Sequence, residues 1–458
     1  MKFKKALLAI PLAMGLAVLA APSAHAANPP LDDNGALVSS DASSPIQVGI
    51  TKYLQTPVGT IIPTDLFTFS ATGNEMSTDD TPVPIGPAPA LNSDNMSLSY
   101  VDGTDQVSAN GDVVTATMNT GDIIDGVQWP HAGIYQYTVT ETGAPSSTDP
   151  SANPYVQWTD STASYLLTVY VANCTTTSNC ASDQSVYVYA VTDMVVSEDS
   201  LNPAPAPAGT KVDPTPGGDT GASGMAFTNN YVKTDNPNGS NPTTNPSLTI
   251  SKAVTGALGD KTKYFDFTVS VNPSSLDVYA PTSYMAYIVD SNGIVEDVTD
   301  NGLTTTSVDS NGDTYVEVPA DGSAFSFSLK DGQSLNFVGV ADGTTYDVNE
   351  VNPTGYEPSY TVTTGETPVA PTDPVVLGNA SGSAGVGQSL DTSTQLVADT
   401  TDGGANLAAY TNLRDIITPT GLTMSQLPFV GLFAVVLLAL VAFIVVRARA
   451  GRKAQANA

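Results

Sequence analysis

Between its two ends, the chain is a succession of short segments in which apolar and polar residues alternate. Val, Thr, Tyr and Phe fill these segments and Gly, Pro, Asn and Asp interrupt them, as in residues 165–172 and 185–191. Alternation with a period of two is typical of half-buried strands, and we find no convincing amphipathic helix in this region. The pattern therefore predicts an all-β protein built from β-sandwiches.

The polar, proline-rich stretch 235–246 divides this region into two parts. It offers no apolar residue to a core, so it predicts a linker between a domain at 44–234 and a domain at 247–416. Two further stretches of low complexity, 197–224 and 365–406, fall inside these domains. We expect both stretches to loop out over the domain surfaces.

The two ends have a different pattern from the middle. Residues 1–26 combine a basic start, an apolar run and small residues before Ala26, which is the order of a secretory signal peptide. Near the other end, within 417–458, the apolar run 432–446 is followed by a basic tail, which predicts a transmembrane segment with a cytoplasmic end. The sequence thus predicts a secreted chain that is held, at least briefly, at the membrane.

The middle of the chain is strongly acidic. Without the seven basic residues of its two ends, eight basic groups stand against 45 acidic ones, which gives a formal charge of −37. A negative field of this size repels phosphate backbones, so nucleic acid is excluded as a partner.

The residues that most enzymes and metal sites require are scarce. His131 is the one histidine outside the signal peptide, so Ser-His-Asp and histidine-based zinc chemistry lack their parts, and no glycine-rich phosphate loop precedes a helix. Residues 309–313 begin like a calcium loop but lack its later glycine and glutamate, which favours a plain Asx turn. We expect no enzyme activity with turnover, no cofactor and no metal.

The two cysteines, Cys174 and Cys180, lie between the alternating segments 165–172 and 185–191. In an oxidising compartment this placement predicts a disulfide at the tip of a hairpin, and the alternative is a pair of free thiols.

The two halves of the chain repeat one order of motifs. Each half has an Ile-x-Lys, then a Phe-x-Phe, then a Tyr-x-Val-x-Glu, and finally an aromatic-Thr-Asn. The Lys, Glu and Asn of these motifs are Lys52, Glu141 and Asn229 in the first half and Lys252, Glu350 and Asn412 in the second.

Strand alternation places each of these lysines and glutamates on an apolar face. Lys52, for example, shares a face with Ile50 and Leu54. For a single residue the simpler interpretation is an edge strand with the charged tip in water, but two matching sets favour burial. Burial lowers a lysine pKa and raises a glutamate pKa, which supplies a neutral amine and a protonated acid. We therefore predict that each lysine attacks the side-chain amide of its asparagine, that the glutamate catalyses the reaction, and that ammonia is lost.

These paired motifs resemble the isopeptide-linked, two-domain major pilins of streptococcal type. The resemblance runs from about residue 48 to residue 447. It implies immunoglobulin-like domains and assigns Lys52, Glu141, Asn229 and Lys252, Glu350, Asn412 as two cross-linking sites. It also implies that the chain is a structural subunit of a covalently polymerised surface pilus.

The segment Ile417-Thr418-Pro419-Thr420-Gly421 resembles a sorting signal, although it departs from the common Leu-Pro-x-Thr-Gly form. A sortase would cleave between Thr420 and Gly421. The segment 427–431 is a rival with Val at the scissile position, and the alternative to both is a plain membrane anchor. The resemblance implies as partners a class C-type pilus sortase, a housekeeping sortase, identical pilin subunits, minor pilins and peptidoglycan.

Polymerisation requires a lysine on the next subunit. Lys211 lies shortly before the last strand of the first domain and resembles the linking lysine of the family, apart from an inserted segment rich in Pro and Gly. Lys233 is the alternative. A monomeric anchored adhesin or pilus tip remains the other class of function, whereas no spacing of acidic residues identifies the site of a surface hydrolase.

Overall fold

The computed structural model divides the chain into two compact units, with unit 1 ending at Lys233 and unit 2 beginning at Thr234. The regular elements of the described part of the chain are strands and short 3-10 helical turns, such as η1 (Ser93–Asn95) and η3 (Thr299–Asn301). The residues that the structure describes are 31–39, 41–79, 81–100, 106–142, 156–202, 205–216, 223–234, 241–365, 379–400 and 405–415.

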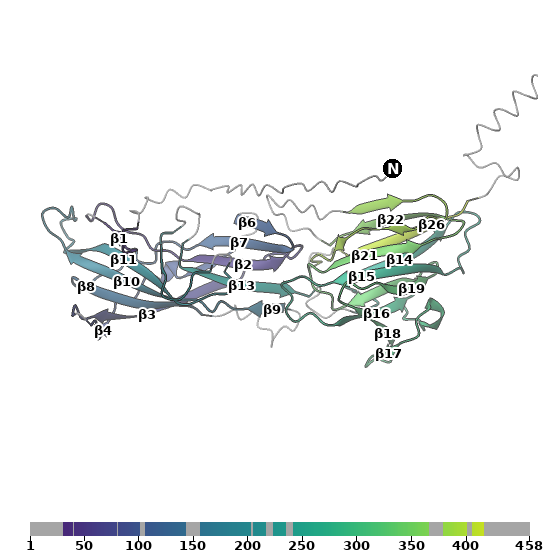
Figure 1. Ribbon diagram of the computed structural model, residues 1–458, viewed down its shortest axis with the longest axis horizontal. Coiled ribbons are helices and arrows are strands. Elements are labelled where there is room, and N and C mark those ends of the chain that lie inside the picture. The colour runs from purple at the N-terminus through teal and green to yellow at the C-terminus, as the bar shows by residue number, and fades with distance from the viewer. Residues whose placement is uncertain are drawn as a thin grey trace, which may run out of the picture. The chain divides into compact units, whose positions relative to one another are not determined.

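Unit 1 consists of two sheets (Figure 1). The larger sheet has the order β1 (Leu37–Val38), β11 (Val186–Ser197), β10 (Ser164–Asn173), β8 (Gly133–Glu141), β3 (Leu66–Met76) and β4 (Pro84–Pro87), with β12 (Lys211–Val212) beside β11 and β5 (Ser97–Ser99) beside β3. The smaller sheet has the order β6 (Gln106–Asn110), β7 (Val113–Asn119), β2 (Thr51–Pro57), β13 (Ala226–Lys233) and β9 (Val156–Thr159).

Unit 2 is also built from two sheets. The larger has the order β17 (Ser307–Val308), β18 (Thr314–Pro319), β16 (Ser283–Val289), β20 (Ser334–Val338), β14 (Leu248–Thr255), β26 (Leu407–Leu413), β22 (Glu357–Thr363) and β23 (Ala380–Ser383). The smaller has the order β19 (Phe325–Leu329), β15 (Phe265–Asn272), β21 (Thr345–Val351) and β24 (Leu390–Asp391), with β25 (Gln395–Leu396) beside β21.

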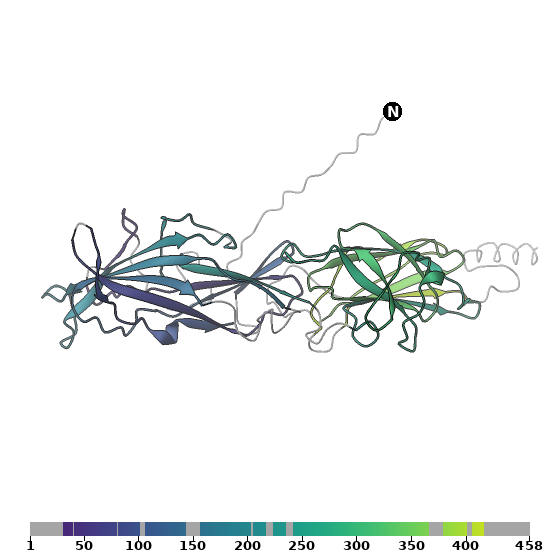
Figure 2. The ribbon, with the colours of Figure 1, turned by 90° about the horizontal axis from the view of Figure 1, so that it is seen from below.

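Alternate residues of both sheets form the core of each unit. On β8 of unit 1, Tyr135, Tyr137 and Val139 are buried, and on β14 of unit 2 the buried residues Leu248 and Ile250 alternate with partly exposed ones. Apolar residues from both sheets of a unit join one core cluster. Each unit is therefore a β-sandwich, and Figure 2 shows the layered strands of both units in a second view.

The first and last long strands of each unit pair in parallel, whereas the other described strand pairs are antiparallel. In unit 1, β2 pairs with β13 and Lys52 lies opposite Phe227. In unit 2, β14 pairs with β26 and Lys252 lies opposite Tyr410. The asparagine of each motif is two residues further along the last strand, so the two units share one register.

The prediction of an all-β fold with two β-sandwich domains is confirmed. The expectation for the stretches 197–224 and 365–406 is wrong in part, because they contribute β12 to unit 1 and β23, β24 and β25 to unit 2. Val397 is fully buried as well. Strands this short pair through their backbones, and a composition rich in Gly and Ser does not prevent that. They are also too short to show an alternation of apolar and polar residues in the sequence.

Within the described stretches, no helix has the length and apolar character that crossing a membrane requires. The predicted signal peptide at 1–26 and the predicted transmembrane run at 432–446 lie outside these stretches.

Candidate functional site

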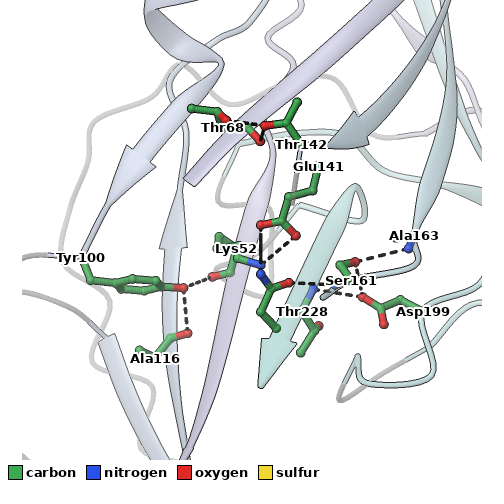
Figure 3. A network of polar contacts seen from close by, with 11 residues as sticks. Lys52, Thr68, Tyr100, Ala116, Glu141, Thr142, Ser161, Ala163, Asp199 and Thr228 are labelled. Atoms are coloured by element: carbon green, nitrogen blue, oxygen red, sulfur yellow. Dashed lines mark hydrogen bonds and ion pairs between the residues drawn. The ribbon is translucent and has the colours of Figure 1, made fainter. Parts of the chain in front are cut away.

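Unit 1 brings the three predicted residues Lys52, Glu141 and Asn229 together between its two sheets. Figure 3 shows the side chains of Lys52 and Glu141 pointing toward each other. Glu141, at the end of β8, faces the neighbouring strands β2 and β13. Its Oε1 lies 2.9 Å from the Lys52 Nζ, and the Asn229 Nδ2 donates to the same oxygen at 3.3 Å. One carboxylate oxygen thus contacts both nitrogens.

This position is closed to water. The side chains of Lys52 and Glu141 are 0% and 2% exposed, and Asn229 is buried as well. Burial lowers the pKa of Lys52 to about 8, although the nearby charge of Glu141 opposes that shift. Burial also raises the pKa of Glu141, with Lys52 acting in the opposite direction. The amine is therefore far easier to deprotonate than an ordinary lysine.

The amide of Asn229 is held from its other side too. The backbone N–H of Ser161, just after β9, donates to the Asn229 Oδ1 at 2.9 Å. The Ser161 hydroxyl in turn donates to Asp199 at 2.6 Å (Figure 3). The amide of Asn229 is thus oriented with its nitrogen toward Glu141 and its oxygen toward a backbone donor.

Unit 2 assembles the matching residues in the same way. Oε1 of Glu350, on β21, lies 2.8 Å from the Lys252 Nζ and accepts from the Asn412 Nδ2 at 2.6 Å. The Lys252 and Glu350 side chains are both 0% exposed. Burial lowers the pKa of Lys252 to about 8, again against the charge of Glu350.

Aromatic rings close both sites. The Lys52 Nζ lies 4.9 Å from the centre of the Phe67 ring, and the Lys252 Nζ lies 4.6 Å from that of Phe265. Both rings come from the Phe-x-Phe motif. These rings are apolar and exclude water from the lysine amine. The face of an aromatic ring also attracts a cation, so it can accommodate the amine while it is still protonated.

The arrangement provides a nucleophilic amine, a carboxyl group that reaches two nitrogens, and an amide, twice in one chain. Among the described residues, no group of three or more His, Cys, Asp or Glu side chains is placed to hold a metal ion. In the run 309–313, Asp309 accepts the backbone N–H groups of Asn311 and Asp313, which makes the Asx turn that the sequence predicts.

The structure places the remaining predicted residues as follows. A disulfide joins Cys174 and Cys180 between β10 and β11. Lys211 is exposed on β12, where its Nζ donates to the backbone oxygen of Asn34 at 2.5 Å, whereas Lys233 on β13 is buried. The residues of the predicted sorting signal, Thr420 and Gly421, lie outside the described residues.

Sequence reasoning missed Ser161 and Asp199. Ser161 contacts Asn229 through a backbone N–H, which every residue except proline carries, so no residue type marks it. In unit 2 no described residue donates to the Asn412 Oδ1, so the repeat of motifs gives no second example of this contact. The Phe-x-Phe motif was visible as a repeat, but its contact with the lysines was not.

Comparison with known proteins gives similarities at low identity. A family model described as a domain of unknown function (DUF7601) matches residues 246–380. No curated protein matches the chain.

Among solved structures, the chain is similar to pilus proteins. A major pilin of Streptococcus pyogenes is 18% identical, with 81% of this chain and 99% of that one covered and a TM-score of 0.27. The T-13 major pilin of the same organism is 18% identical, with 83% and 99% covered and a TM-score of 0.26. A pilus-presented adhesin, Cpa, is 11% identical, with 80% and 99% covered and a TM-score of 0.19. At these values, function has to be argued from the residues of this chain.

Proposed function

We propose that this chain is a structural subunit of a covalently polymerised pilus on a Gram-positive cell surface, and that each unit closes on itself through a Lys–Asn isopeptide bond. The main support is the recurrence of one buried Lys–Glu–Asn site, at one register of the first and last strands, in both units. A buried ion pair rarely adds stability over apolar residues, so its repetition needs another explanation.

In the proposed reaction of unit 1, the neutral Nζ of Lys52 attacks Cγ of Asn229, and the bond from Cγ to Nδ2 breaks. Glu141 takes a proton from the attacking nitrogen and gives it to the departing one, so ammonia leaves and the carboxyl group is regenerated. Its Oε1 contacts both nitrogens, as this transfer requires. Glu350 would serve Lys252 and Asn412 in the same way. Each reaction happens once, so it is maturation of a structural protein and not enzymatic turnover.

The position of the bonds suits a protein that carries tension. Each bond would join the first long strand of a unit to its last strand, which already lie side by side. Force that enters one strand would then pass through the bond to the other, and the rest of the sandwich would stay unloaded.

Polymerisation would join the Thr420 acyl group, cleaved from Gly421 by a class C-type pilus sortase, to a lysine of the next identical subunit. Lys211 suits this role better than Lys233, because Lys211 is exposed on β12 and Lys233 is 7% exposed. A housekeeping sortase would then anchor the polymer, with any minor pilins, to peptidoglycan.

Expression with a pilus sortase in a Gram-positive host tests the polymer. We expect wall extracts to give a ladder on denaturing gels, and we expect Lys211→Ala to abolish it while Lys233→Ala leaves it intact. A single wall-linked band from the parent chain would contradict the shaft subunit and would favour the monomeric adhesin.

A further inference from the structure

The two cross-linking sites differ in what contacts the amide oxygen. In unit 1 the Asn229 Oδ1 accepts the backbone N–H of Ser161 at 2.9 Å. In unit 2 the Asn412 Oδ1 is buried and has no hydrogen-bond partner among the described residues. Pro358, which lies opposite Asn412 on β22, has no N–H to offer.

Asp199 ties the donor of unit 1 to the strand that carries the acceptor. Its Oδ2 accepts the Ser161 hydroxyl at 2.6 Å and the backbone N–H of Thr228, the neighbour of Asn229, at 3.0 Å. Its Oδ1 accepts the N–H of Leu201 at 3.1 Å, and the residue is 5% exposed. A buried carboxylate that bridges the loop after β9 and strand β13 fixes the Ser161 N–H against Asn229.

We propose that the Ser161 N–H stabilises the oxyanion that forms when Lys52 attacks Asn229, and that Asp199 positions this donor. The proposal rests on the isopeptide function proposed above. During attack, the carbon–oxygen double bond of the amide opens and negative charge collects on Oδ1. A backbone N–H that already points at this atom stabilises the charge without rearrangement. The oxygen loses its charge again when ammonia leaves, so the N–H is not consumed.

Unit 2 shows no equivalent donor. The Asn412 Nδ2 donates to the Glu350 Oε1 at 2.6 Å, and no described residue donates to the Asn412 Oδ1. A backbone donor to the amide oxygen is therefore a feature of unit 1 among the described residues.

The rate of bond formation in each unit tests this. Residues 27–420, which include every described residue, are made by cell-free synthesis, synthesis is stopped, and samples are quenched in denaturant at intervals. Peptide mass spectrometry then follows the two bonds separately, so unit 2 serves as an internal control. We expect Ser161→Pro, which removes the N–H, to slow the bond of unit 1 by about 100-fold or more and to leave unit 2 unchanged. Ser161→Ala keeps the N–H and is the matched control, with a rate within about tenfold of the parent.

Asp199→Ala tests the positioning role. We expect it to slow the unit 1 bond by about tenfold, the value of one hydrogen bond, and we expect Asp199→Asn to recover most of the rate. In the Ser161→Pro background, Asp199→Ala should add no further slowing, because the residue acts through the missing N–H. If Asp199 had only a structural role, Asp199→Ala would slow the unit 1 bond by the same factor in the parent and in the Ser161→Pro background.

Melting temperatures measured in the Glu141→Ala background, where unit 1 forms no bond, show whether each variant folds. A folded Ser161→Pro chain that forms the unit 1 bond at the parental rate overturns the proposal. If Ser161→Pro does not fold, a parental rate in Asp199→Ala overturns it instead. A parent chain that forms neither bond refutes the proposed function, which is a separate outcome.

Discussion

The charged neighbours of each lysine in the two sites affect the pKa of its amine. Glu141, Asp199 and Asp160 act on Lys52 by their charge, and Glu350, Asp331 and Lys263 act on Lys252. In both cases burial outweighs the carboxylates, which act in the opposite direction, and lowers the lysine pKa to about 8, while Lys263 acts in the same direction as burial. The two sites thus start alike, and the difference between them lies in the donor to the amide oxygen.

The lowered lysine pKa predicts one form of pH profile for both bonds. The neutral amine is the form that attacks, and burial lowers the pKa of Lys52 and of Lys252 to about 8. The rate of bond formation in each unit should therefore rise about tenfold per pH unit toward pH 8 and then level off.

Bond formation in each unit between pH 6 and 10, followed by quenching and mass spectrometry, measures these profiles. Glu141→Ala is the control, because it removes the unit 1 reaction at every pH. A rate that does not change between pH 6 and pH 8 would contradict attack by the neutral amine.

At the scale of elements, the alternation of β2 and β14 predicted which residues face the core. Lys52 and Lys252 are buried as expected, because a side chain between two core-facing neighbours has no other direction. The neighbouring strand was not predictable, since pairing of β2 with β13 depends on contacts between residues far apart in the sequence. The Ser161 donor and the short strands β23, β24 and β25 were not predictable either. They form through backbone groups, which every residue type except proline carries in full, so no residue pattern marks them.

One packing contact of unit 1 can be tested directly. Gly73 on β3 lies opposite Tyr137 on β8, and a Cβ at this glycine would overlap the Tyr137 ring. Gly73→Ala should therefore reduce the free energy of unfolding by about 1 to 3 kcal/mol.

Gly86→Ala on the neighbouring strand β4 is the matched control for that change. A Cβ at Gly86 would have 4.0 Å of space, so its effect should stay within about 0.5 kcal/mol. Chemical denaturation measures both variants in the Glu141→Ala background. Equal effects of Gly73→Ala and Gly86→Ala would contradict the packing that the structure shows.

The proposed bond between β2 and β13 should also stabilise unit 1. Closing a loop of this size removes entropy from the unfolded chain, which on the disulfide model is worth roughly 5 kcal/mol. Asn229→Ala keeps the Lys52–Glu141 pair but cannot form the bond, so the melting temperature of unit 1 should fall by about 10 to 20 °C.

Calorimetry of the two-unit chain resolves this, with the transition of unit 2 as the internal control. A unit 1 transition that moves by less than about 3 °C would show that the bond is absent or does not constrain the unfolded chain.

At the scale of the whole molecule, the repetition of one site in both units is the main support for the proposed chemistry. Two sandwiches of different sequence carry Lys, Glu and Asn at one register of equivalent strands. Of the two candidate linking lysines, Lys211 is exposed and Lys233 is buried. The two proposed bonds, the exposed Lys211 and a formal charge of −37 between the ends support the proposed role as a subunit that is cross-linked on folding and then joined to copies of itself.

The intact mass of the reduced chain from residue 27 to residue 420 tests the central claim most directly. The parent should be lighter than its sequence by two ammonias, Glu141→Ala and Glu350→Ala should each be lighter by one, and the double variant should have its full mass. A parent chain with its full sequence mass would contradict the account, because Lys52 and Lys252 would then be buried lysines that form no bond.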